Sequence, residues 1–481
     1  MNGFRKYPVL VVLIFSHLLF WAQENNYWNS QFGAKSTLLG GAAVSSYLDN
    51  GALFYNPATL CFKDSGDLAV SANIYQIEDI KMTNAIGDGL DVAGSNYVIA
   101  PQIISGNLMI TRKFEMGFIF LTRNNVDFSI NKSHQGFYSL YPSETGILPF
   151  NFIADYSLRN RILEQWAGVA LSYTINDKWG IGITNFLGYR YQKYIKGLTA
   201  TAIYTDTAYT NYGGYVEKYD YQREVTYDNL NYILKAGIAY NGEILNAGLS
   251  VTLPSANIFG LGKSNYYRFD NNISVLHTTD SSQYSNLVFD KENRLAVVYK
   301  TPLSVALGIA IKFPKTKIYL SAEYFHSLNS YDLIKPQHNN NLTTVKNSVQ
   351  YNSADVVGVT KSARPLLNFG MGYERKLSGS VSLLMGFHSD FNSVGPYNAT
   401  RSEDEISVSY FNIWHATAGA AFMHSKRTVT IGIAGAYGVI KGEPQVSNFT
   451  APSDETLLLG TTSDISTCIY RSLGLVLGVV F

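Results

Sequence analysis

Cysteine and charged residues are both scarce in this chain of 481 residues. Only Cys61 and Cys468 are present, which excludes a disulfide framework or a zinc site and leaves open whether these two form one bond. Charged residues make up 15% of the chain, whereas an average soluble protein carries roughly 25%. The net charge of +1 gives no support to nucleic-acid binding.

Long apolar runs are missing as well. The run at 9–21 follows Arg5 and Lys6 and precedes Ala22, which is the pattern of a secretory signal peptide over residues 1–22. This run is shorter than the ~20 apolar residues that span a bilayer as a helix. No later segment comes close to about 18 consecutive apolar residues, which is the length expected of a membrane helix. We therefore expect an exported chain that is either a secreted protein or a membrane barrel.

Alternation with a period of two residues is what the chain has in abundance. Residues 303–313 alternate large apolar side chains with small or polar ones, and the pattern recurs at 167–175, 367–374 and 429–434. A soluble sandwich would carry more Lys and Glu on its outer face, whereas the second face here is Gly, Ala, Ser and Thr. Near-zero mean hydropathy and 35 tyrosines fit a polar lumen and aromatic girdles. The predicted fold class is all-β, a transmembrane antiparallel β-barrel.

Short turns and long loops alternate along the chain, as outer-membrane barrels require. We predict tight turns near 112–113, 176–178, 241–243, 313–316, 377–379 and 424–426, and long loops at roughly 79–94, 124–160, 195–227, 255–292, 329–365, 393–406 and 442–465. These connections give 14 strands, with 12 or 16 as alternatives, and put both chain ends on the periplasmic side. The chain ends in an alternating strand that closes on Phe481, which is similar to the sorting signal of outer-membrane barrels. The expected location is the outer membrane of a Gram-negative bacterium.

The stretch before the first expected strand, residues 33–60, is rich in small residues and nearly uncharged. Its Gly-Gly pair, Asp-Asn-Gly turn and Asn-Pro turn predict a compact, tightly folded segment. Its most distinctive features are Gly33 with Ala34, Gly40 with Gly41 and Ala42, Asp49, the aromatic pair Phe54 and Tyr55, and Asn56 with Pro57 and Ala58. On these residues the segment resembles the N-terminal hatch of the FadL/TodX family, outer-membrane transporters for hydrophobic compounds.

The resemblance implies a barrel of 14 strands with a small N-terminal hatch inside the lumen. It divides the chain into a signal peptide (1–22), a hatch or plug (23–65) and a transmembrane β-barrel (66–481). It also implies that the hatch lines the route by which an apolar ligand leaves sideways, through a gap at a kinked strand. The residues that it assigns to the ligand path or its gate are Gly40, Gly41, Asp49, Phe54, Tyr55, Asn56, Pro57 and Ala58.

Sideways release is physically reasonable, because an apolar ligand that passes directly into the bilayer stays out of water. A gap in the wall leaves strand backbone unpaired, which is costly in lipid. Asn56 is a candidate partner for that backbone, and Pro57 tolerates an unpaired position because it has no N–H. The alternative is that both residues only maintain the shape of the hatch, since Asn-Pro is a common start of a turn.

The predicted loop 195–227 departs from the family, in which an apolar capture groove is expected on the outer loops. Tyrosine-rich polar loops suit an aromatic or amphipathic ligand, a protein or a glycan, and solvated loops with interfacial aromatics are the alternative. The tyrosines of this loop are Tyr204, Tyr209, Tyr212, Tyr215, Tyr219 and Tyr221.

The histidines give no sign of catalysis. His388 and Asp390 share one face of a strand while Ser389 points to the other, so this trio predicts a lumen hydrogen bond rather than a catalytic dyad. His415 and His424 fall at opposite ends of one strand, too far apart to bind one metal ion. No EF-hand, P-loop or HExxH motif occurs. We expect no enzyme activity, no cofactor and no metal site.

Three functions remain, the third of which is a surface adhesin that uses its tyrosine-rich loops. The first is passive uptake of a small hydrophobic, fatty-acid-like compound with lateral release into the membrane, because the roughly 40 residues before the first strand are too few for the plug of an energy-coupled transporter. The second is that of a partner, shuttle or plug component in a type IX-like protein secretion system, with 195–227 and 255–292 as a protein interface. The expected partners are therefore a hydrophobic ligand or lipid, outer-membrane lipids and, on the second hypothesis, a secretion protein.

Overall fold

A computed structural model describes residues 25–63, 67–143, 146–204, 216–273, 285–338, 342, 352–394, 406, 410–425, 427–453 and 456–481. The predicted signal peptide over residues 1–22 lies outside this part of the chain. Among the described residues, no helix is long and apolar enough to cross a membrane.

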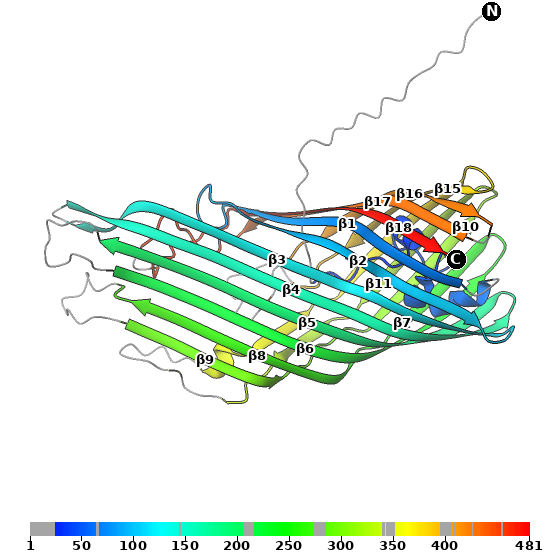
Figure 1. Ribbon diagram of the computed structural model, residues 1–481, viewed down its shortest axis with the longest axis horizontal. Helices are drawn as coiled ribbons and strands as arrows, with labels where there is room; N and C mark the ends of the chain where they lie inside the picture. Colours follow the sequence, from blue (N-terminus) through cyan, green and yellow to red (C-terminus); the bar gives the residue numbers. More distant parts are fainter. Residues whose placement is uncertain are drawn as a thin grey trace, which may run out of the picture.

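Fourteen antiparallel strands close into one barrel within the described part of the chain (Figure 1). The ring closes where the last strand, β18, pairs with the first, β1, so the predicted fold class and the count of 14 strands are confirmed. The ring strands are β1 (Asp67–Thr83), β2 (Val92–Met109), β3 (Phe114–Ser143), β4 (Gly146–Asn176), β5 (Trp179–Tyr204), β6 (Val216–Asn241), β7 (Leu245–Thr252), β10 (Ser304–Lys312), β11 (Thr316–Phe325), β14 (Leu366–Lys376), β15 (Val381–Asp390), β16 (Ile413–His424), β17 (Arg427–Glu443) and β18 (Ser466–Val480).

The barrel wall has two heights. We call β3, β4, β5 and β6 the tall wall, because they have 30, 31, 26 and 26 residues. We call β10, β11, β14, β15 and β16 the short wall, because they have only 9 to 12 residues. Since 9–11 residues suffice to cross a bilayer, the short wall just spans the membrane and the tall wall extends beyond it (Figure 1).

The tall wall is extended by a hairpin. The strands β8 (Ala256–Asn271) and β9 (Ser285–Ala296) continue β7 and β10 after interruptions at 253–255 and 297–303. β6 pairs with β7 near the tight turns and with β8 farther out. Three predicted loops, 124–160, 195–227 and 255–292, are therefore wrong over most of their length, because they contain strands.

The predicted tyrosine-rich loop is corrected in the same way. Tyr204, Tyr219 and Tyr221 lie on β5 and β6 and are buried, whereas Tyr209, Tyr212 and Tyr215 lie outside the described residues. The buried tyrosines face the interior because they occupy the inward positions of the alternation. They belong to an internal cluster, not to a solvated loop.

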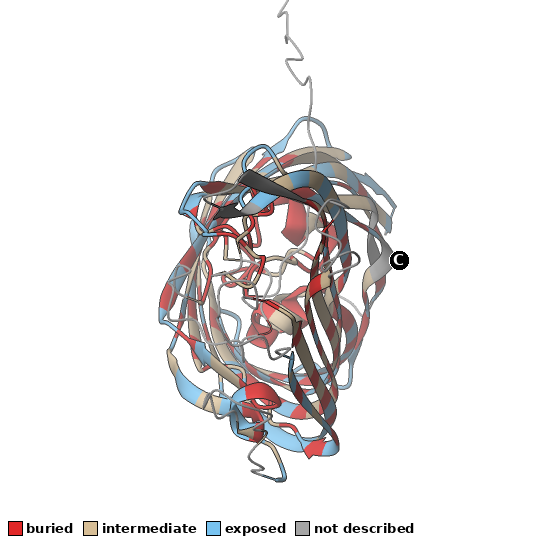
Figure 2. Ribbon diagram, turned by 90° about the vertical axis from the view of Figure 1, so that its left-hand side faces the viewer, coloured by how far each residue is buried: buried red, intermediate tan, exposed pale blue. Residues whose placement is uncertain are grey.

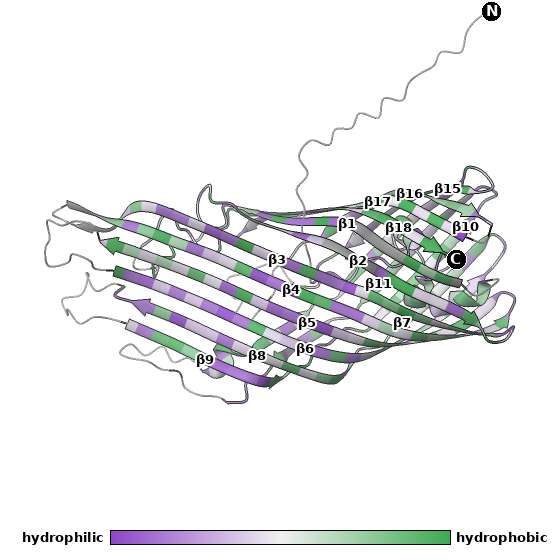
Figure 3. Ribbon diagram, in the orientation of Figure 1, coloured by the Kyte–Doolittle hydropathy of each residue, from purple (hydrophilic) through white to green (hydrophobic). Residues whose placement is uncertain are grey.

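Hydrophobic and less hydrophobic residues alternate along the strands of the short wall (Figure 3), and the exposed ones are the large apolar side chains. Leu307 and Ile309 are 59% and 45% exposed, while Ala306 and Ala310 between them are buried. Large apolar side chains thus face outward and small ones face inward. In a soluble protein the large apolar side chains would face inward, so this outward arrangement is that of a barrel surrounded by lipid.

The N-terminal segment, residues 25–63, lies inside the ring of strands (Figure 2). It contains α1 (Ala34–Leu38), α2 (Ala52–Tyr55) and the 3₁₀ helix η1 (Pro57–Phe62). Its apolar side chains pack against inward residues of both walls, for example Leu53 against a cluster with Phe186 and Leu38 against a cluster with Leu384. The helices are at the position predicted for a hatch, while the hatch function and its limits at 23–65 stay predictions.

The outer mouth is narrowed by connecting segments. The small sheet of β12 (Leu328–Ile334) and β13 (Val359–Ala363), with α3 (Ser353–Val356) between them, packs on the inner face of β6. Arg223 of β6 is buried there and donates to the carbonyl of Gly358 at 2.6 Å. These segments join the inward tyrosines and phenylalanines of the tall wall in one large internal cluster.

Candidate functional site

A single carboxylate organises the first half of the N-terminal segment. Asp49 accepts hydrogen bonds from the backbone N–H groups of Lys35, Ser36 and Gly51 and from the Ser36 hydroxyl, at 2.8–3.0 Å. Because the first N–H groups of a helix have no partner within the helix, Asp49 stabilises the start of α1 from a distant loop. Burial raises the pKa of the Asp49 carboxyl, and these hydrogen bonds oppose the shift.

Gly40 and Gly41 allow the segment to touch the short wall. Both have positive φ, +65° and +69°, which L side chains rarely adopt. A Cβ on Gly40 would lie 2.7–2.8 Å from backbone atoms of Phe387 and Met371 on β15 and β14. Backbone therefore packs on backbone here, and no larger residue fits without a shift.

Asn56, Pro57 and Ala58 face the tall wall. The side-chain amide of Asn56 donates to the carbonyls of Val44 at 2.8 Å and Ile238 at 3.1 Å. Its Oδ1 accepts from the N–H of Ala58, which caps η1. Pro57 begins η1, where its missing N–H costs nothing.

The contacts of Asn56 fall where the barrel wall is intact. Ile238 is in register with Ile181 of β5 on one side and Leu249 of β7 on the other. Asn56 thus joins the segment to β6 without replacing a missing ladder partner at that point. Its proposed role at a gap stays a prediction.

Phe54 and Tyr55 border an inner cavity of about 40 Å³ between the segment and the wall. The Tyr55 hydroxyl donates to the Gln31 side chain at 2.8 Å and accepts from the N–H of Phe32 at 2.9 Å. Phe54 packs on Phe32 with 4.6 Å between ring centroids. Because a water molecule takes up ~30 Å³ in the liquid, this cavity has no room for a larger ligand while the segment is in place.

Two cations line the inner cavity among aromatic rings. The Lys235 ammonium of β6 lies 4.6 Å from the Phe54 ring centroid, and the Arg123 guanidinium of β3 lies 4.6 Å from that of Trp166. Arg123 also approaches Glu164 at 3.5 Å. Glu323 of β11 also lines the cavity, so the carboxylates of Glu164 and Glu323 balance the two cations. The cavity therefore combines charged and polar groups with aromatic faces, a combination that suits an amphipathic ligand.

A larger outer cavity of about 190 Å³ lies toward the long loops. Its walls are mainly apolar and aromatic, with Val92 of β2, Phe128 of β3 and Tyr194 of β5 among them. Lys196 and Glu443 also line it. Cys468 lines this cavity as well, and neither Cys468 nor Cys61 is in a disulfide bond.

The wall beside both cavities has a break between β2 and β3. Their ladder runs only from the pair Met109 and Glu115 to the pair Ile103 and Leu121. Farther out, β2 continues to Val92 paired with β1 alone, and β3 continues paired with β4 alone. Leu121 is seven residues from the start of β3, about 18 Å along the membrane normal at ~3.3 Å per residue and ~40° tilt, within the ~25 Å apolar band.

One side chain bridges this break. Asn96 of β2 donates to the carbonyl of Asn125 at 3.3 Å and accepts from the N–H of Asp127 at 3.2 Å. It is buried and also donates to Glu78 at 2.8 Å. An asparagine amide thus supplies a donor and an acceptor in place of the absent backbone pairs, which makes this part of the wall a local exception to continuous pairing.

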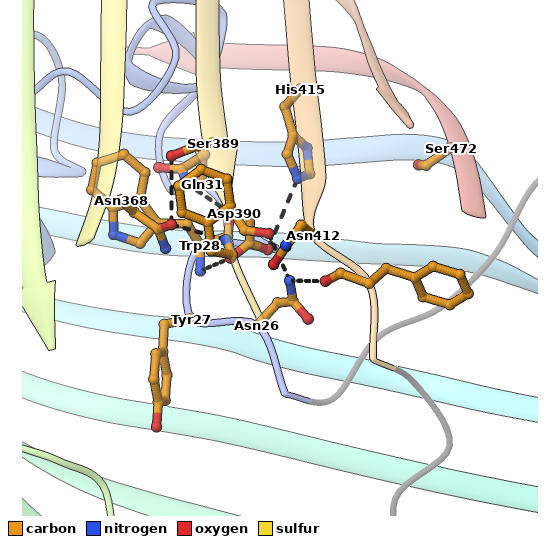
Figure 4. Close-up of polar contacts among 12 residues, drawn as sticks. Asn26, Tyr27, Trp28, Gln31, Asn368, Ser389, Asp390, Asn412, His415 and Ser472 are labelled. Atoms are coloured by element: carbon orange, nitrogen blue, oxygen red, sulfur yellow. Dashed lines mark hydrogen bonds and ion pairs between the residues drawn. The ribbon is translucent and has the colours of Figure 1, made fainter. Parts of the chain in front are cut away.

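A polar latch ties the start of the N-terminal segment to the outer end of the short wall (Figure 4). The Asp390 carboxylate accepts from the N–H of Trp28 at 2.9 Å, and Asn26 donates to the Asp390 carbonyl at 2.8 Å. The rings of His388 and His415 stack beside it with centroids 4.1 Å apart. We call Asn26, Trp28 and Asp390 the latch.

The latch contains one of the three neighbouring residues His388, Ser389 and Asp390 that resemble a catalytic group in the sequence. Asp390 is hydrogen-bonded in the lumen, but its partner is the N-terminal backbone, so the pairing of His388 with Asp390 that the sequence predicts is wrong: the His388 ring stacks on His415 instead. The Ser389 hydroxyl approaches Asn368 and Phe369 of the neighbouring strand, each at 3.5 Å, so it is turned away from His388. Within the described residues, no group of three His, Cys, Asp or Glu side chains is arranged to hold a metal ion.

These features define the class of the protein: a 14-stranded outer-membrane channel-type barrel with a folded segment in its lumen. No protein-family model and no curated protein matches the sequence. Solved structures do match. A Pseudomonas aeruginosa FadL homologue is 16% identical with a TM-score of 0.55, and 96% of this chain and 99% of that one are covered.

Two toluene transporters are also similar in structure. TodX of Pseudomonas putida is 14% identical with a TM-score of 0.53, covering 96% of this chain and 99% of that one. TbuX of Ralstonia pickettii is 10% identical with a TM-score of 0.53, covering 93% and 97%. At such identities the likeness shows the fold, which is that of the FadL/TodX channels. A barrel of this fold with an apolar exterior is located in the outer membrane of a Gram-negative bacterium.

Sequence reasoning missed the residues that the barrel contributes. Arg123, Trp166 and Lys235 come from three strands, and only closure of the ring brings them around Phe54. No local spacing reveals such a set. A signal for the wall break was present in Pro101, since a proline within a central strand removes a ladder donor.

Proposed function

We propose that the chain is a passive outer-membrane channel for small hydrophobic, fatty-acid-like compounds, with lateral release into the membrane. The observation that carries the proposal is the break between β2 and β3, which lies beside an outer cavity lined mainly by apolar and aromatic side chains and an inner cavity that mixes aromatic rings with polar and charged groups. The outer cavity has the volume for a ligand of roughly one aromatic ring, because cavities of ~150 Å³ bind benzene. The titles of the similar structures, which name toluene transport for those proteins, agree with this class of ligand.

Lateral release follows from where the break lies. An apolar ligand that leaves the lumen between β2 and β3 enters hydrocarbon directly, so its apolar surface is never exposed to water. Backbone groups left unpaired within the apolar band cost several kcal/mol each when they face lipid. The Asn96 bridge reaches Asn125 and Asp127, 11 and 13 residues from the start of β3, about 28–33 Å by the same conversion, so it holds the two strands together just beyond this band. The break is thus stable enough to persist and is less firmly closed than an intact ladder.

Residues 23–65 are proposed to act as a hatch, with Gly40, Gly41, Asp49, Phe54, Tyr55, Asn56, Pro57 and Ala58 as its ligand-path and gating residues. The size of the inner cavity supports this role, because a ligand passes Phe54 and Tyr55 only if the segment moves. Arg123 and Lys235, which Glu164 and Glu323 balance in charge, place polar groups beside the aromatic rings, and this mixture suits the polar end of a fatty-acid-like ligand.

A covalent lock across the break tests the proposal. With Cys61 and Cys468 replaced by Ser, the pair Asn96→Cys and Asn125→Cys joins β2 to β3 when oxidised. Uptake of labelled decanoate and of toluene by expressing cells is then expected to fall at least tenfold, and reductant is expected to restore it.

The matched control joins two strands that are already paired. Ala418 and Ile433 are partners in the intact ladder of β16 and β17, so the pair Ala418→Cys and Ile433→Cys leaves uptake unchanged. Wild-type uptake through the oxidised β2–β3 lock would rule out this exit. Loss of protein export with normal uptake would instead favour the secretion-partner hypothesis, which none of the contacts described above supports.

A further inference from the structure

A row of basic side chains crosses the outside of the tall wall. In the strand register Arg161 of β4 lies opposite Lys193 of β5, and Thr226 of β6 lies between Lys193 and Lys263 of β8. All three basic side chains face outward and are 37–55% exposed. Arg159, two residues farther out on β4, is 51% exposed on the same face. We call Arg159, Arg161, Lys193 and Lys263 the basic row.

The depth of the row follows from the side chains below it. Outward positions of β5 from Trp179 to Tyr189 are mostly large and apolar, with Ile181, Ile183 and Leu187 each at least 40% exposed. Trp179 packs near Tyr240 at the end with the tight turns, with 5.0 Å between ring centroids, as expected of an inner aromatic girdle.

The length of β5 places the row just outside the hydrocarbon. Lys193 is 14 residues beyond Trp179, which is about 35 Å along the membrane normal at ~3.3 Å per residue and ~40° tilt. The apolar band of such barrels is ~25 Å tall. The row therefore lies at the level of the lipid head groups in the outer leaflet, directly above the exposed Tyr189.

The row has an excess of positive charge. Two carboxylates lie within it, and each is shared by two cations. Asp127 contacts Arg159 at 3.1 Å and Arg161 at 3.8 Å. Glu224 contacts Lys263 at 3.1 Å and Lys193 at 3.7 Å. Four cations against these two carboxylates leave a net charge of about +2 on a face that the strands hold rigid. Asp228, the next outward residue of β6 toward the membrane, is bonded to the Tyr189 hydroxyl and reduces the excess around the row to about +1.

We infer that the basic row binds the phosphate groups of phosphorylated lipids in the outer leaflet. Arginine binds phosphate through paired N–H donors and lysine as a point charge, and the row presents both at head-group depth. The strands of the short wall end near the limit of the apolar band, so this lipid contact is confined to one side of the barrel. The inference is independent of the ligand that passes through the lumen.

The test measures binding of the detergent-purified full chain to bis-phosphorylated lipid A and to the same lipid after dephosphorylation, by native mass spectrometry. The wild-type chain is expected to prefer the phosphorylated lipid at least tenfold. The triple variant Arg161→Gln, Lys193→Gln, Lys263→Gln is expected to lose that preference. A heat-modifiable band on gels verifies that the barrel is folded, and the single variant K263Q, at an exposed position, is expected to show a two- to threefold loss.

A variant with the same change in charge is the control. The end of the barrel with the tight turns carries three exposed lysines, Lys178, Lys315 and Lys376. Their replacement by Gln removes three positive charges from the end of the barrel opposite to the basic row. This control keeps the preference for phosphorylated lipid. Equal binding of both lipids by the wild type, or an unchanged preference in the triple variant, would overturn the inference. Displacement of lipid A by equimolar inorganic phosphate would show that the row is a general anion site, and that result also rejects a lipid site.

Discussion

The tall wall and the short wall are built on the same alternation but face different surroundings. The short wall has lipid outside and the N-terminal segment inside, so its outward residues are large and apolar and its inward residues are small. The outer half of the tall wall has an aromatic cluster inside and the basic row outside, so large rings occupy the inward positions there. The same strand geometry therefore accepts opposite patterns, because the environment of each face decides which residues are stable there.

Removing an aromatic ring from the inner face of the tall wall is the largest expected effect. Phe152 of β4 is fully buried and packs on Tyr138 and Phe449, with ring centroids 5.6 and 6.0 Å apart. Phe152→Ala is expected to destabilise the outer half by ~3–5 kcal/mol, as buried Phe→Ala changes do. Denaturant unfolding of the barrel in detergent measures the change.

The matched variant is on the outer face of the short wall. Phe369 is 41% exposed toward lipid, so Phe369→Ala leaves no cavity and is expected to cost less than half as much. Equal losses for the two variants would mean that the inner cluster of the tall wall is not a packed core.

The second largest loss of stability is expected when a charged side chain is placed on the outer surface of the barrel. Leu307 lies at the middle of β10 and is 59% exposed, so Leu307→Arg is expected to cost ~2–4 kcal/mol, as at the bilayer midplane of other barrels. Ile195 faces outward beside the basic row, in register with Arg159, and Ile195→Arg is expected to cost ~0–1 kcal/mol. Equilibrium refolding into vesicles checks both values. Similar penalties would show that the tall wall does not leave the membrane where the register puts it.

Breaking the latch is expected to affect stability less than Phe152→Ala or Leu307→Arg, and it acts on the lumen. Asp390→Ala removes the acceptor of the Trp28 N–H, and an unsatisfied buried donor costs ~1–3 kcal/mol. Residues 25–31 are expected to lose hydrogen-exchange protection, and single-channel conductance in planar bilayers is expected to rise. Asp220→Ala, which breaks a half-exposed pair with Lys218 on the tall wall, is the control. Unchanged protection at residues 25–31 would show that other contacts hold the segment.

The strands of the short wall were predictable from sequence because large apolar residues alternate along them with small or polar ones. Residues 303–313 and 429–434 gave correct strands, and the tight turns between strands were also correct. The outer half of the tall wall was missed because polar residues outside and tyrosines inside, as at Tyr219 and Tyr221, leave little contrast in hydropathy. Composition alone makes such strands look like polar loops.

The site was predictable only in its N-terminal part. Asp49 and the stretch 54–58 form local turns and caps, whose sequence signals lie within a few residues. Arg123, Lys235 and the β2–β3 break depend on strand register, which a single sequence does not specify over such distances. Register is a property of paired strands, and the partner of each strand is set by closure of the whole ring.

The latch also sets an order of events in biogenesis. Asn26 and Asp390 are 364 residues apart in the sequence, and contacts of such separation form late because the intervening chain must be organised first. The N-terminal segment leaves the ribosome first but is anchored only after β15 and β16 exist to receive it. The latch therefore cannot form until β15, late in the chain, is in place, and until then the start of the N-terminal segment lacks its contact with the barrel.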